Sequence, residues 1–174
     1  SKLLLAAYGI PVVREGLAGS VAAAQRLADT IGFPVALKGC GPLLQHKTEA
    51  DVIDLGVTDR ANLARAFRRI SAVAPTTLDG VLVQEMVRGS RELAMGLLRD
   101  PQFGPCVLFG LGGVLAEVLD DTAFRVAPFD RLEAQEMIGD IRARKILDPF
   151  RGEPRADVGQ LCDALQALGR IGCD

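Results

Sequence analysis

Three short turns between residues 91 and 127 most constrain what this chain can fold into. They lie at residues 100–105, 110–113 and 120–121 and separate short apolar segments. A crossover that joins parallel strands takes about a dozen residues or more, so segments joined by turns this short must pair antiparallel. We therefore predict an antiparallel sheet, with successive strands at residues 91–98, 106–109, 114–119 and 122–127.

Helical patterns predict what covers this sheet. Asp130, with Glu133 three residues later, forms a capping box that opens a helix. Apolar residues recur at helical spacing again over 158–168, which predicts a last helix. We expect residues of about 89–174 to form the larger lobe of an α+β fold, with segment 1–13 packing on it.

The preceding part of the chain, about 14–88, alternates between helical and extended patterns. Ser20 is positioned to cap the first helix of this part. The predicted helices occupy residues 21–31 and 59–74, and the predicted strands occupy 35–38, 52–57 and 81–87. We expect this smaller lobe to be a small open α/β unit.

Charge and hydropathy argue against two classes of partner. The 20 basic and 22 acidic residues give a net charge of −2 without a block of one sign, which argues against nucleic acid or an acidic membrane surface. Although 49% of the residues are hydrophobic, no run approaches the roughly 18 apolar residues of a membrane-spanning helix. The apolar residues therefore belong to a core or an interface, and the oligomeric state stays open.

The cysteines indicate the redox compartment of this protein, and the chain ends indicate whether it is part of a longer one. The four cysteines form no CxxC pair, and a single histidine leaves little for a soft metal site. We expect buried free thiols in a reducing cytoplasm, and the sequence shows no signal peptide pattern. Because it lacks an initiator methionine and stops in what reads as the end of a helix, we expect a piece of a longer protein.

Lys38 ends an apolar strand, where its charge cannot stay buried without an anionic partner. The loop that follows contains Gly39 and Gly41, and then the only histidine, His46, beside Lys47. Ammonium groups beside flexible glycines suit phosphate oxygens, because backbone N–H groups and positive charge converge there. This stretch predicts a phosphate site.

Carboxylates later in the chain suit Mg²⁺. Glu117 interrupts an apolar segment, and Asp120 and Asp121 form the next turn. Mg²⁺ takes oxygen ligands and usually bridges to substrate phosphates. Together with the lysines, these carboxylates predict a site for a nucleotide with Mg²⁺, in a cleft between the two lobes.

Each of these residues also has a structural interpretation that the sequence leaves open. Lys38 is compatible with a snorkelling surface side chain, and His46 with an ordinary solvated or hydrogen-bonded histidine. The glycines at 110–113 fit a tight hairpin turn that needs positive φ. Asp120 and Asp121 fit a turn that holds no metal.

The order of the motifs along the chain carries a resemblance. In sequence order they are Lys38, His46-Lys47-Thr48, Val83-Gln84-Glu85-Met86-Val87, residues 99–105, Phe109-Gly110-Leu111-Gly112-Gly113 with Glu117, Phe124-Arg125 and Arg151-Gly152-Glu153-Pro154. This succession resembles the ATP-grasp domain of the NDP-forming acyl-CoA synthetases, the relatives of the succinyl-CoA synthetase β subunit. The resemblance covers nearly the whole chain and implies an ATP-grasp fold with the nucleotide between two lobes.

The resemblance implies roles in binding ATP or ADP. Lys38 would reach the α and β phosphates, with Lys47 as a second lysine near phosphate. The implied contacts to the rest of the nucleotide come from the backbone of Glu85, Met86 and Val87 at the adenine edge, from Glu92 at the ribose hydroxyls, and from Gly112 and Gly113 against the triphosphate.

The resemblance also implies the metal ligands and the residues of phosphoryl transfer. Glu117 would hold Mg²⁺, with Asp120 or Asp121 as a weaker second candidate. Arg125 would face the transferred phosphoryl group, and His46 would receive phosphate transiently. Lysine, arginine and Mg²⁺ together supply the positioning and charge neutralisation that phosphoryl transfer requires.

The reaction implied by the family is the reversible conversion of acyl-CoA, ADP and phosphate into the acid, CoA and ATP through a phosphohistidine. The principal histidine belongs to a separate CoA-binding domain of the same protein or of a partner subunit. Because His46 is the only histidine here, this chain would supply only the nucleotide half-reaction.

The sequence departs from the family after the His-Lys pair, where residues 49–53 contain none of the usual glycines. A loop without them approaches phosphate less easily, which weakens the implied role of His46 more than ATP binding. Two other interpretations stay open. One is a non-catalytic, ligand-sensing synthetase-like domain fused to a protein lysine acetyltransferase, and the other is a glycine-rich α/β domain without a nucleotide site.

Overall fold

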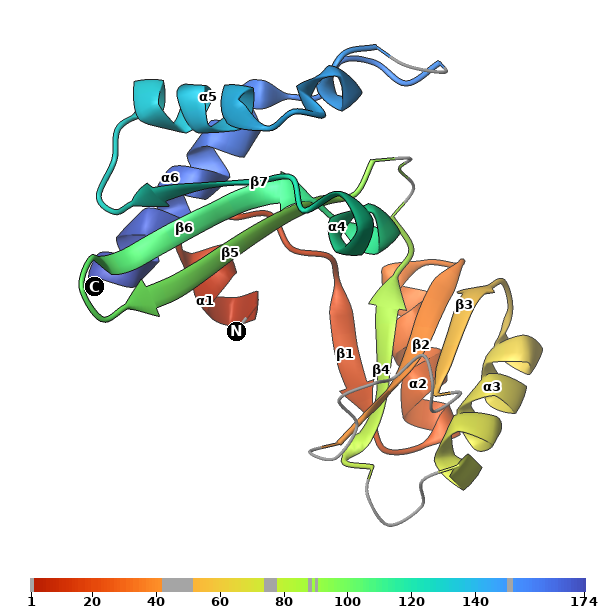
Figure 1. Cartoon of the computed structure of the whole chain (residues 1–174). Helices are drawn as coiled ribbons and strands as arrows, with labels where there is room; N and C mark the ends of the chain where they lie inside the picture. The colour runs from red at the N-terminus through yellow and green to blue at the C-terminus, as the bar shows by residue number, and fades with distance from the viewer. Residues whose placement is uncertain (1, 42–51, 74–77, 88, 90, 150–151) are drawn as a thin grey trace. The chain divides into compact units, whose positions relative to one another are not determined.

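The structure, a computed structural model, describes residues 2–41, 52–73, 78–87, 89, 91–149 and 152–174. The backbone divides into two compact units (Figure 1). The first unit comprises residues 13–88, and the second unit comprises residues 1–12 and 89–174.

The first unit contains a four-stranded sheet with strand order β1-β4-β2-β3. The strands are β1 (Glu15–Ala18), β2 (Val35–Cys40), β3 (Ile53–Val57) and β4 (Gly80–Glu85). Every neighbouring pair is antiparallel. β1 and β2 therefore run in the same direction with β4 between them, and β3 and β4 run in the same direction with β2 between them. The sequence predicted a small open α/β unit here, and the sheet of this unit is antiparallel throughout.

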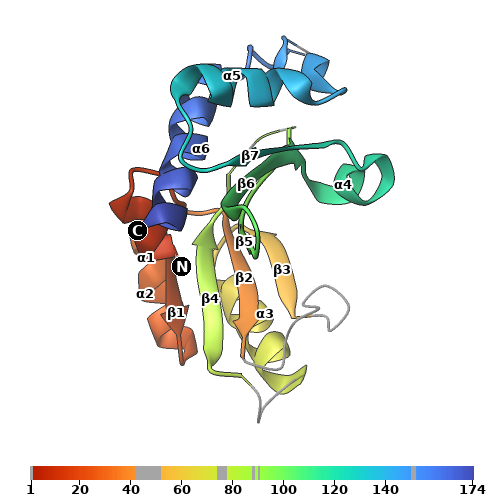
Figure 2. The same ribbon diagram turned by 60° about the vertical axis from the view of Figure 1, so that its left-hand side comes forward.

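Two helices cover one face of this sheet, α2 (Val21–Ile31) and α3 (Arg60–Val73) (Figure 2). Ser20 caps α2, as predicted, by accepting a hydrogen bond from the backbone N–H of Ala23. The core between helices and sheet is formed by buried apolar side chains, among them Ala24, Ala28, Val35, Leu37, Leu63, Phe67, Ile70, Val81 and Val83.

Alternate residues of the same strands point to the opposite face of the sheet. The strand register pairs Glu15 with Gln84, Leu17 with Leu82, Ala36 with Gln84, and Lys38 with Leu82. These six residues therefore share one face, which we call the Lys38 face. Because Leu37 and Val83 point toward the helices, Lys38 and Gln84 point away from them.

The second unit is built on a three-stranded antiparallel sheet with order β5-β6-β7. Its strands are β5 (Leu93–Asp100), β6 (Gly104–Leu111) and β7 (Thr122–Val126), and its helices are α1 (Lys2–Ala7), α4 (Gly113–Leu119), α5 (Arg131–Asp140) and α6 (Val158–Cys173), with a 3-10 turn η1 (Arg144–Leu147). The capping box of Asp130 and Glu133 at the start of α5 is confirmed.

The core of the second unit lies between this sheet and α5 and α6. Val107 and Phe109 of β6 are fully buried and pack with Met137 of α5 and Leu165 of α6. Leu5 and other N-terminal side chains pack against the same core. Among the described residues, no helix is long and apolar enough to cross a membrane.

The prediction of a strand at residues 114–119 was wrong, because this segment belongs to the helix α4. A short apolar run has too few residues for its periodicity to separate strand from helix. The sheet therefore has three strands, and Glu117 lies on a helix. The predicted burial of the free thiols holds for Cys106 and Cys162, whereas Cys40 is half-buried and Cys173 is exposed.

We predict that Leu37→Ala lowers the free energy of unfolding by about 2–5 kcal/mol, because the substitution leaves a cavity at a fully buried position between the sheet and its helices. Leu55→Ala is the matched control, since Leu55 is 63% exposed and its loss should cost within about 0.5 kcal/mol. Urea denaturation measures both. Equal losses in the two variants would contradict the assignment of the core.

Candidate functional site

Lys38 lies on β2 with its side chain half-buried on the Lys38 face. Its Nζ donates a hydrogen bond to Oε1 of Gln84 over 2.6 Å. The Nε2 of Gln84 in turn donates to Oε2 of Glu15 over 2.7 Å. This line of contacts crosses β2, β4 and β1, and the group that receives the Lys38 hydrogen bond is a neutral amide. The ammonium is therefore held in place while its charge stays available for an anion.

Sequence reasoning missed Gln84 and Glu15 as partners of Lys38. Gln84 is a polar residue in a valine-rich strand, at a position that alternates with Val81 and Val83. That alternation was a usable signal for a side chain on the face away from the core. The pairing of β4 with β2 and β1 was needed to connect it to Lys38.

Glu85 ends β4, and its side chain is engaged by Arg14. The guanidinium of Arg14 donates to both carboxylate oxygens of Glu85, from Nη2 over 2.9 Å and from Nε over 3.2 Å. The pKa of Glu85 is lowered, chiefly by this side-chain hydrogen bond. The backbone N–H of Glu85 donates to the carbonyl of Arg14. Met86 and Val87 come after the strand, and the backbone contact of Glu85, Met86 and Val87 to adenine stays a prediction.

In the second unit the structure brings together Glu92, Gly112 and Gly113. The N–H of Gly112 donates to the carbonyl of Glu92 over 2.8 Å. A Cβ added to Gly113 would lie 1.8 Å from Oε2 of Glu92, and φ at Gly113 is +58°. The positive φ favours glycine at 113, and Gly112 lies close to backbone, since a Cβ added there would lie 3.1 Å from the carbonyl carbons of Glu92 and Leu93. The alternative of a tight hairpin turn was wrong, because the segment leads from β6 into a helix.

Arg125 lies on β7 opposite Val107, which is fully buried beneath α5 and α6. Arg125 is therefore on the helix-covered face of the sheet. Its Nη2 forms an ion pair with Asp140 near the end of α5 over 2.6 Å. Phe124 and Val126 occupy the opposite face. This placement gives Arg125 a role in joining β7 to α5 and argues against its predicted contact with the transferred phosphoryl group.

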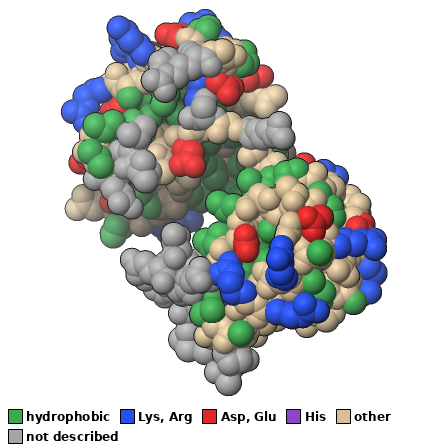
Figure 3. All heavy atoms as spheres, turned by 90° about the vertical axis from the view of Figure 1, so that its right-hand side faces the viewer, with side chains coloured by type: hydrophobic (Ala, Val, Ile, Leu, Met, Phe, Trp, Pro, Cys, Tyr) green, Lys and Arg blue, Asp and Glu red, His purple; other side chains and the backbone are tan. Residues whose placement is uncertain are grey.

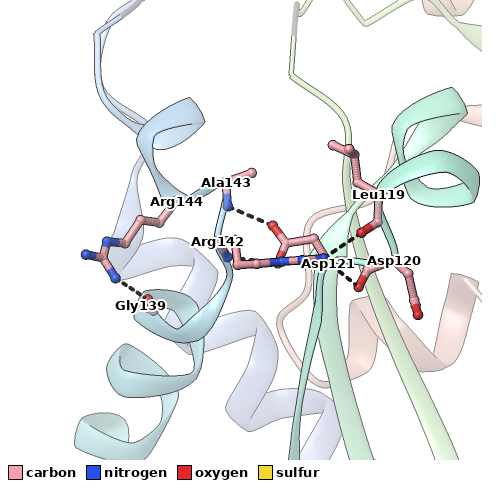
Figure 4. A network of polar contacts seen from close by, with 7 residues as sticks. All are labelled: Leu119, Asp120, Asp121, Gly139, Arg142, Ala143 and Arg144. Atoms are coloured by element: carbon pink, nitrogen blue, oxygen red, sulfur yellow. Dashed lines mark hydrogen bonds and ion pairs between the residues drawn. The ribbon is translucent and has the colours of Figure 1, made fainter.

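Asp121 also has a structural role (Figure 4). Its carboxylate is 6% exposed, and its oxygens accept hydrogen bonds from the backbone N–H groups of Arg142 over 2.8 Å and of Ala143 over 2.7 Å. The Arg142 side chain donates to the carbonyl of Leu119 at the end of α4. Asp121 thus ties the start of β7 to the segment after α5, a role that competes with the predicted Mg²⁺ contact.

For the remaining predicted site residues, the structure gives a backbone position or no position. Glu117 lies on α4, one turn after Gly113. His46 and Lys47 lie outside the described residues. No group of three or more His, Cys, Asp or Glu side chains that could hold a metal ion occurs in the described part of the chain. A single carboxylate suits Mg²⁺ only where phosphate oxygens and water complete the coordination.

Two pockets lined by described residues lie away from the predicted site residues. One, of about 270 Å³, lies between β3 and α3 and is lined in part by Arg65 and Arg69. Figure 3 shows Lys and Arg side chains gathered on this side of the first unit. The other, of about 510 Å³, lies beside η1 and is lined in part by Arg144, Lys145 and Arg155. Neither contains a residue to which the sequence assigned a role.

We predict that Asp121→Asn lowers the melting temperature at pH 7, because its amide NH₂ would face a backbone N–H of Arg142 or Ala143. The backbone hydrogen bond from Ala143 is the main reason that the pKa of Asp121 is lowered. The stabilisation is therefore present above the ordinary aspartate pKa of about 3.9 and is lost as pH falls below it.

The difference in melting temperature between wild type and Asp121→Asn should accordingly shrink between pH 7 and about pH 3. Asp148→Asn, at an exposed carboxylate, serves as the control for removing one negative charge. If Asp121→Asn had the same melting temperature as the wild type at pH 7, the Asp121 contacts would not stabilise this unit.

Comparison with known proteins identifies relatives along the whole chain. A family model described as an ATP-grasp domain matches residues 1–174. The acetate–CoA ligase [ADP-forming] I of Archaeoglobus fulgidus is 42% identical over 98% of this chain, which spans 26% of that ligase. The β subunit of acetate–CoA ligase [ADP-forming] II of Pyrococcus furiosus is 36% identical over 98% of this chain, which spans 75% of that subunit.

Solved structures agree with these sequence matches. The dinucleotide-forming acetyl-coenzyme A synthetase 1 of Ca. Korarchaeum cryptofilum, in complex with coenzyme A and Mg-AMPPCP, matches with a TM-score of 0.87 and 39% identity over 99% of this chain and 76% of that chain. In that structure a phosphohistidine segment points towards the nucleotide binding site. The α+β fold, with its antiparallel sheets and covering helices, is the ATP-grasp fold. The chain therefore belongs to the family of ATP-grasp domains.

Proposed function

We propose that this chain is the nucleotide-binding part of an ADP-forming acyl-CoA synthetase. In this role it transfers a phosphoryl group between ATP or ADP and a phosphohistidine of a partner domain or subunit. The overall reaction converts acyl-CoA, ADP and phosphate into the acid, CoA and ATP. The observation that carries the proposal is the hydrogen bond of 2.6 Å from the Lys38 ammonium to the neutral amide of Gln84. It occurs in a chain that these ligases match over 98% of its length.

The proposed contacts in the first unit follow from its geometry. Lys38 binds the α and β phosphates, because its positive charge is hydrogen-bonded but not neutralised by Gln84. The backbone of Met86 and Val87 binds the adenine edge, since these residues follow the end of β4 and Val87 is 65% exposed. The N–H of Glu85 already serves Arg14 and is left out of this contact.

The proposed contacts in the second unit centre on the start of α4. Glu92 binds ribose hydroxyls, because its side chain is exposed and acidic. Gly112 and Gly113 let phosphate approach the backbone, as residues without a Cβ do. Glu117 is the proposed Mg²⁺ ligand, and the ion would neutralise phosphate charge when bound. We leave Arg125 out of the site, and Asp121 has a structural role.

A partner domain or subunit is part of the proposal. The chain spans about a quarter of the A. fulgidus ligase and about three quarters of the P. furiosus β subunit, so the related proteins carry further domains or subunits. The phosphohistidine segment of the Korarchaeum synthetase supports a histidine that approaches the nucleotide from elsewhere in the protein. We propose His46 as a secondary acceptor and a cytoplasmic location for the whole enzyme.

We predict that Mg-ADP or Mg-ATP raises the melting temperature of the full-length protein. A ligand that binds only the folded state stabilises it by about 2.7 kcal/mol at one hundred times its dissociation constant. Lys38→Ala should abolish the shift and leave the fold intact. Lys145→Ala, at an exposed lysine of η1, is the matched control and should retain the shift.

Differential scanning fluorimetry measures these shifts. No shift of the wild type at millimolar nucleotide would overturn the proposed function. Binding without phosphoryl transfer to any histidine, tested by mass spectrometry after incubation with ATP, would point instead to the ligand-sensing interpretation.

A further inference from the structure

The three residues Glu15, Gln84 and Lys38 form a polar line across neighbouring strands of one sheet. Figure 1 shows β4 between β1 and β2, which places Gln84 between the other two side chains. Glu15 pairs with Gln84 in the β1–β4 register, and Ala36 pairs with Gln84 in the β4–β2 register. The small side chain of Ala36 at this position leaves room for Gln84 to reach Lys38.

The chemistry of the three side chains fixes how Gln84 is oriented. An ammonium can only donate hydrogen bonds, and a carboxylate can only accept them. Gln84 offers both an acceptor and a donor, so its carbonyl oxygen must face Lys38 and its NH₂ must face Glu15. This matches the observed contacts of 2.6 Å and 2.7 Å. By accepting from the Gln84 NH₂, Glu15 thus orients the Gln84 carbonyl oxygen toward Lys38.

The same arrangement places the Gln84 amide between Lys38 and Glu15, where it is hydrogen-bonded to both charged groups. A direct ion pair with a carboxylate would neutralise the charge of Lys38. A neutral amide holds the ammonium by a hydrogen bond and does not neutralise its charge. Leu82 shares this face and is half-buried. Both hydrogen bonds are partly buried, and partial burial strengthens hydrogen bonds by lowering the local dielectric constant.

We propose that Gln84 is a positioning residue that holds the Lys38 ammonium ready for nucleotide phosphate, and that Glu15 fixes the orientation of the Gln84 amide. The inference rests on the proposed function, because it assumes that Lys38 binds phosphate. A lysine side chain is flexible and loses rotamer freedom when it binds. Ordering it beforehand lowers the entropy lost on binding and so tightens the complex.

The test measures the dissociation constant of Mg-ADP for variants of the full-length protein by isothermal titration calorimetry. Gln84→Met keeps the length of the side chain and removes the acceptor, and it should weaken binding about tenfold, the equivalent of one hydrogen bond. Glu15→Met should weaken binding less, because Gln84 can still accept from Lys38. Gln25→Met, the same substitution on α2 at a half-buried glutamine that donates to the carbonyl of Arg60, should leave binding unchanged.

Gln84→Glu separates a positioning role from a structural one. A glutamate still accepts the Lys38 hydrogen bond but cannot donate to Glu15 as the Gln84 amide does. The variant is therefore made together with Glu15→Gln, whose amide supplies the lost donor, so that a purely structural role would be satisfied. We expect binding to weaken at least as much as in Gln84→Met, because the new carboxylate neutralises Lys38 and repels phosphate. The loss relative to wild type should shrink as KCl is raised, since salt screens charge repulsion. If Gln84→Met does not fold, this salt-dependent loss tests the same point.

The outcomes distinguish this inference from the proposed function. If the wild type does not bind Mg-ADP, the proposed function fails and the inference with it. If the wild type binds and Lys38→Ala does not, but Gln84→Met and Gln84→Glu bind as tightly as wild type, the inference is overturned and the proposed function stands. Weakened binding in Gln84→Met and Gln84→Glu, with Gln25→Met unchanged, supports the positioning role.

Discussion

The burial of one face of each sheet beneath two helices is the constraint on which the rest of this structure depends. In the first unit Leu37 and Val83 point into the core beneath α2 and α3. Because side chains alternate along a strand, the next positions, Lys38 and Gln84, must point the other way. The lysine that we assign to phosphate is thus placed by the packing of its apolar neighbours, and its hydrogen bond to Gln84 refines a position that the core already determines.

The same constraint decides the roles of the charged residues in the second unit. Val107 is buried beneath α5 and α6, so Arg125, which lies opposite it, also faces the helices and pairs with Asp140. Asp121 is held by backbone N–H groups beyond α5. The sequence suggested Asp121 as a turn carboxylate suited to Mg²⁺, and the family resemblance suggested Arg125. A charged side chain on a packed face needs a partner, and here the described partners come from the protein itself.

Local signals in the sequence predicted much of the fold and some of the site. The Ser20 cap, the Asp130 capping box and the turn at residues 100–105 each act within a few residues, and the structure confirms them. The predicted turns at 110–113 and 120–121 instead lie before and after the helix α4. The order of the first sheet was not predictable in this way, because its pairings join distant strands. Lys38 and Gln84 are 46 residues apart in the sequence. The helix α4 was missed because seven residues carry little periodicity.

Amide hydrogen exchange of the full-length protein with and without Mg-ADP tests most directly whether these residues form a nucleotide site. The account predicts that exchange slows at Met86 and Val87 and around Glu92, Gly112 and Gly113, because backbone groups there become protected by the nucleotide. It predicts no local change at Arg125 and Asp140. Unchanged exchange at residues 86–87 and 112–113, with protection appearing around α5 instead, would contradict the assignment of the site.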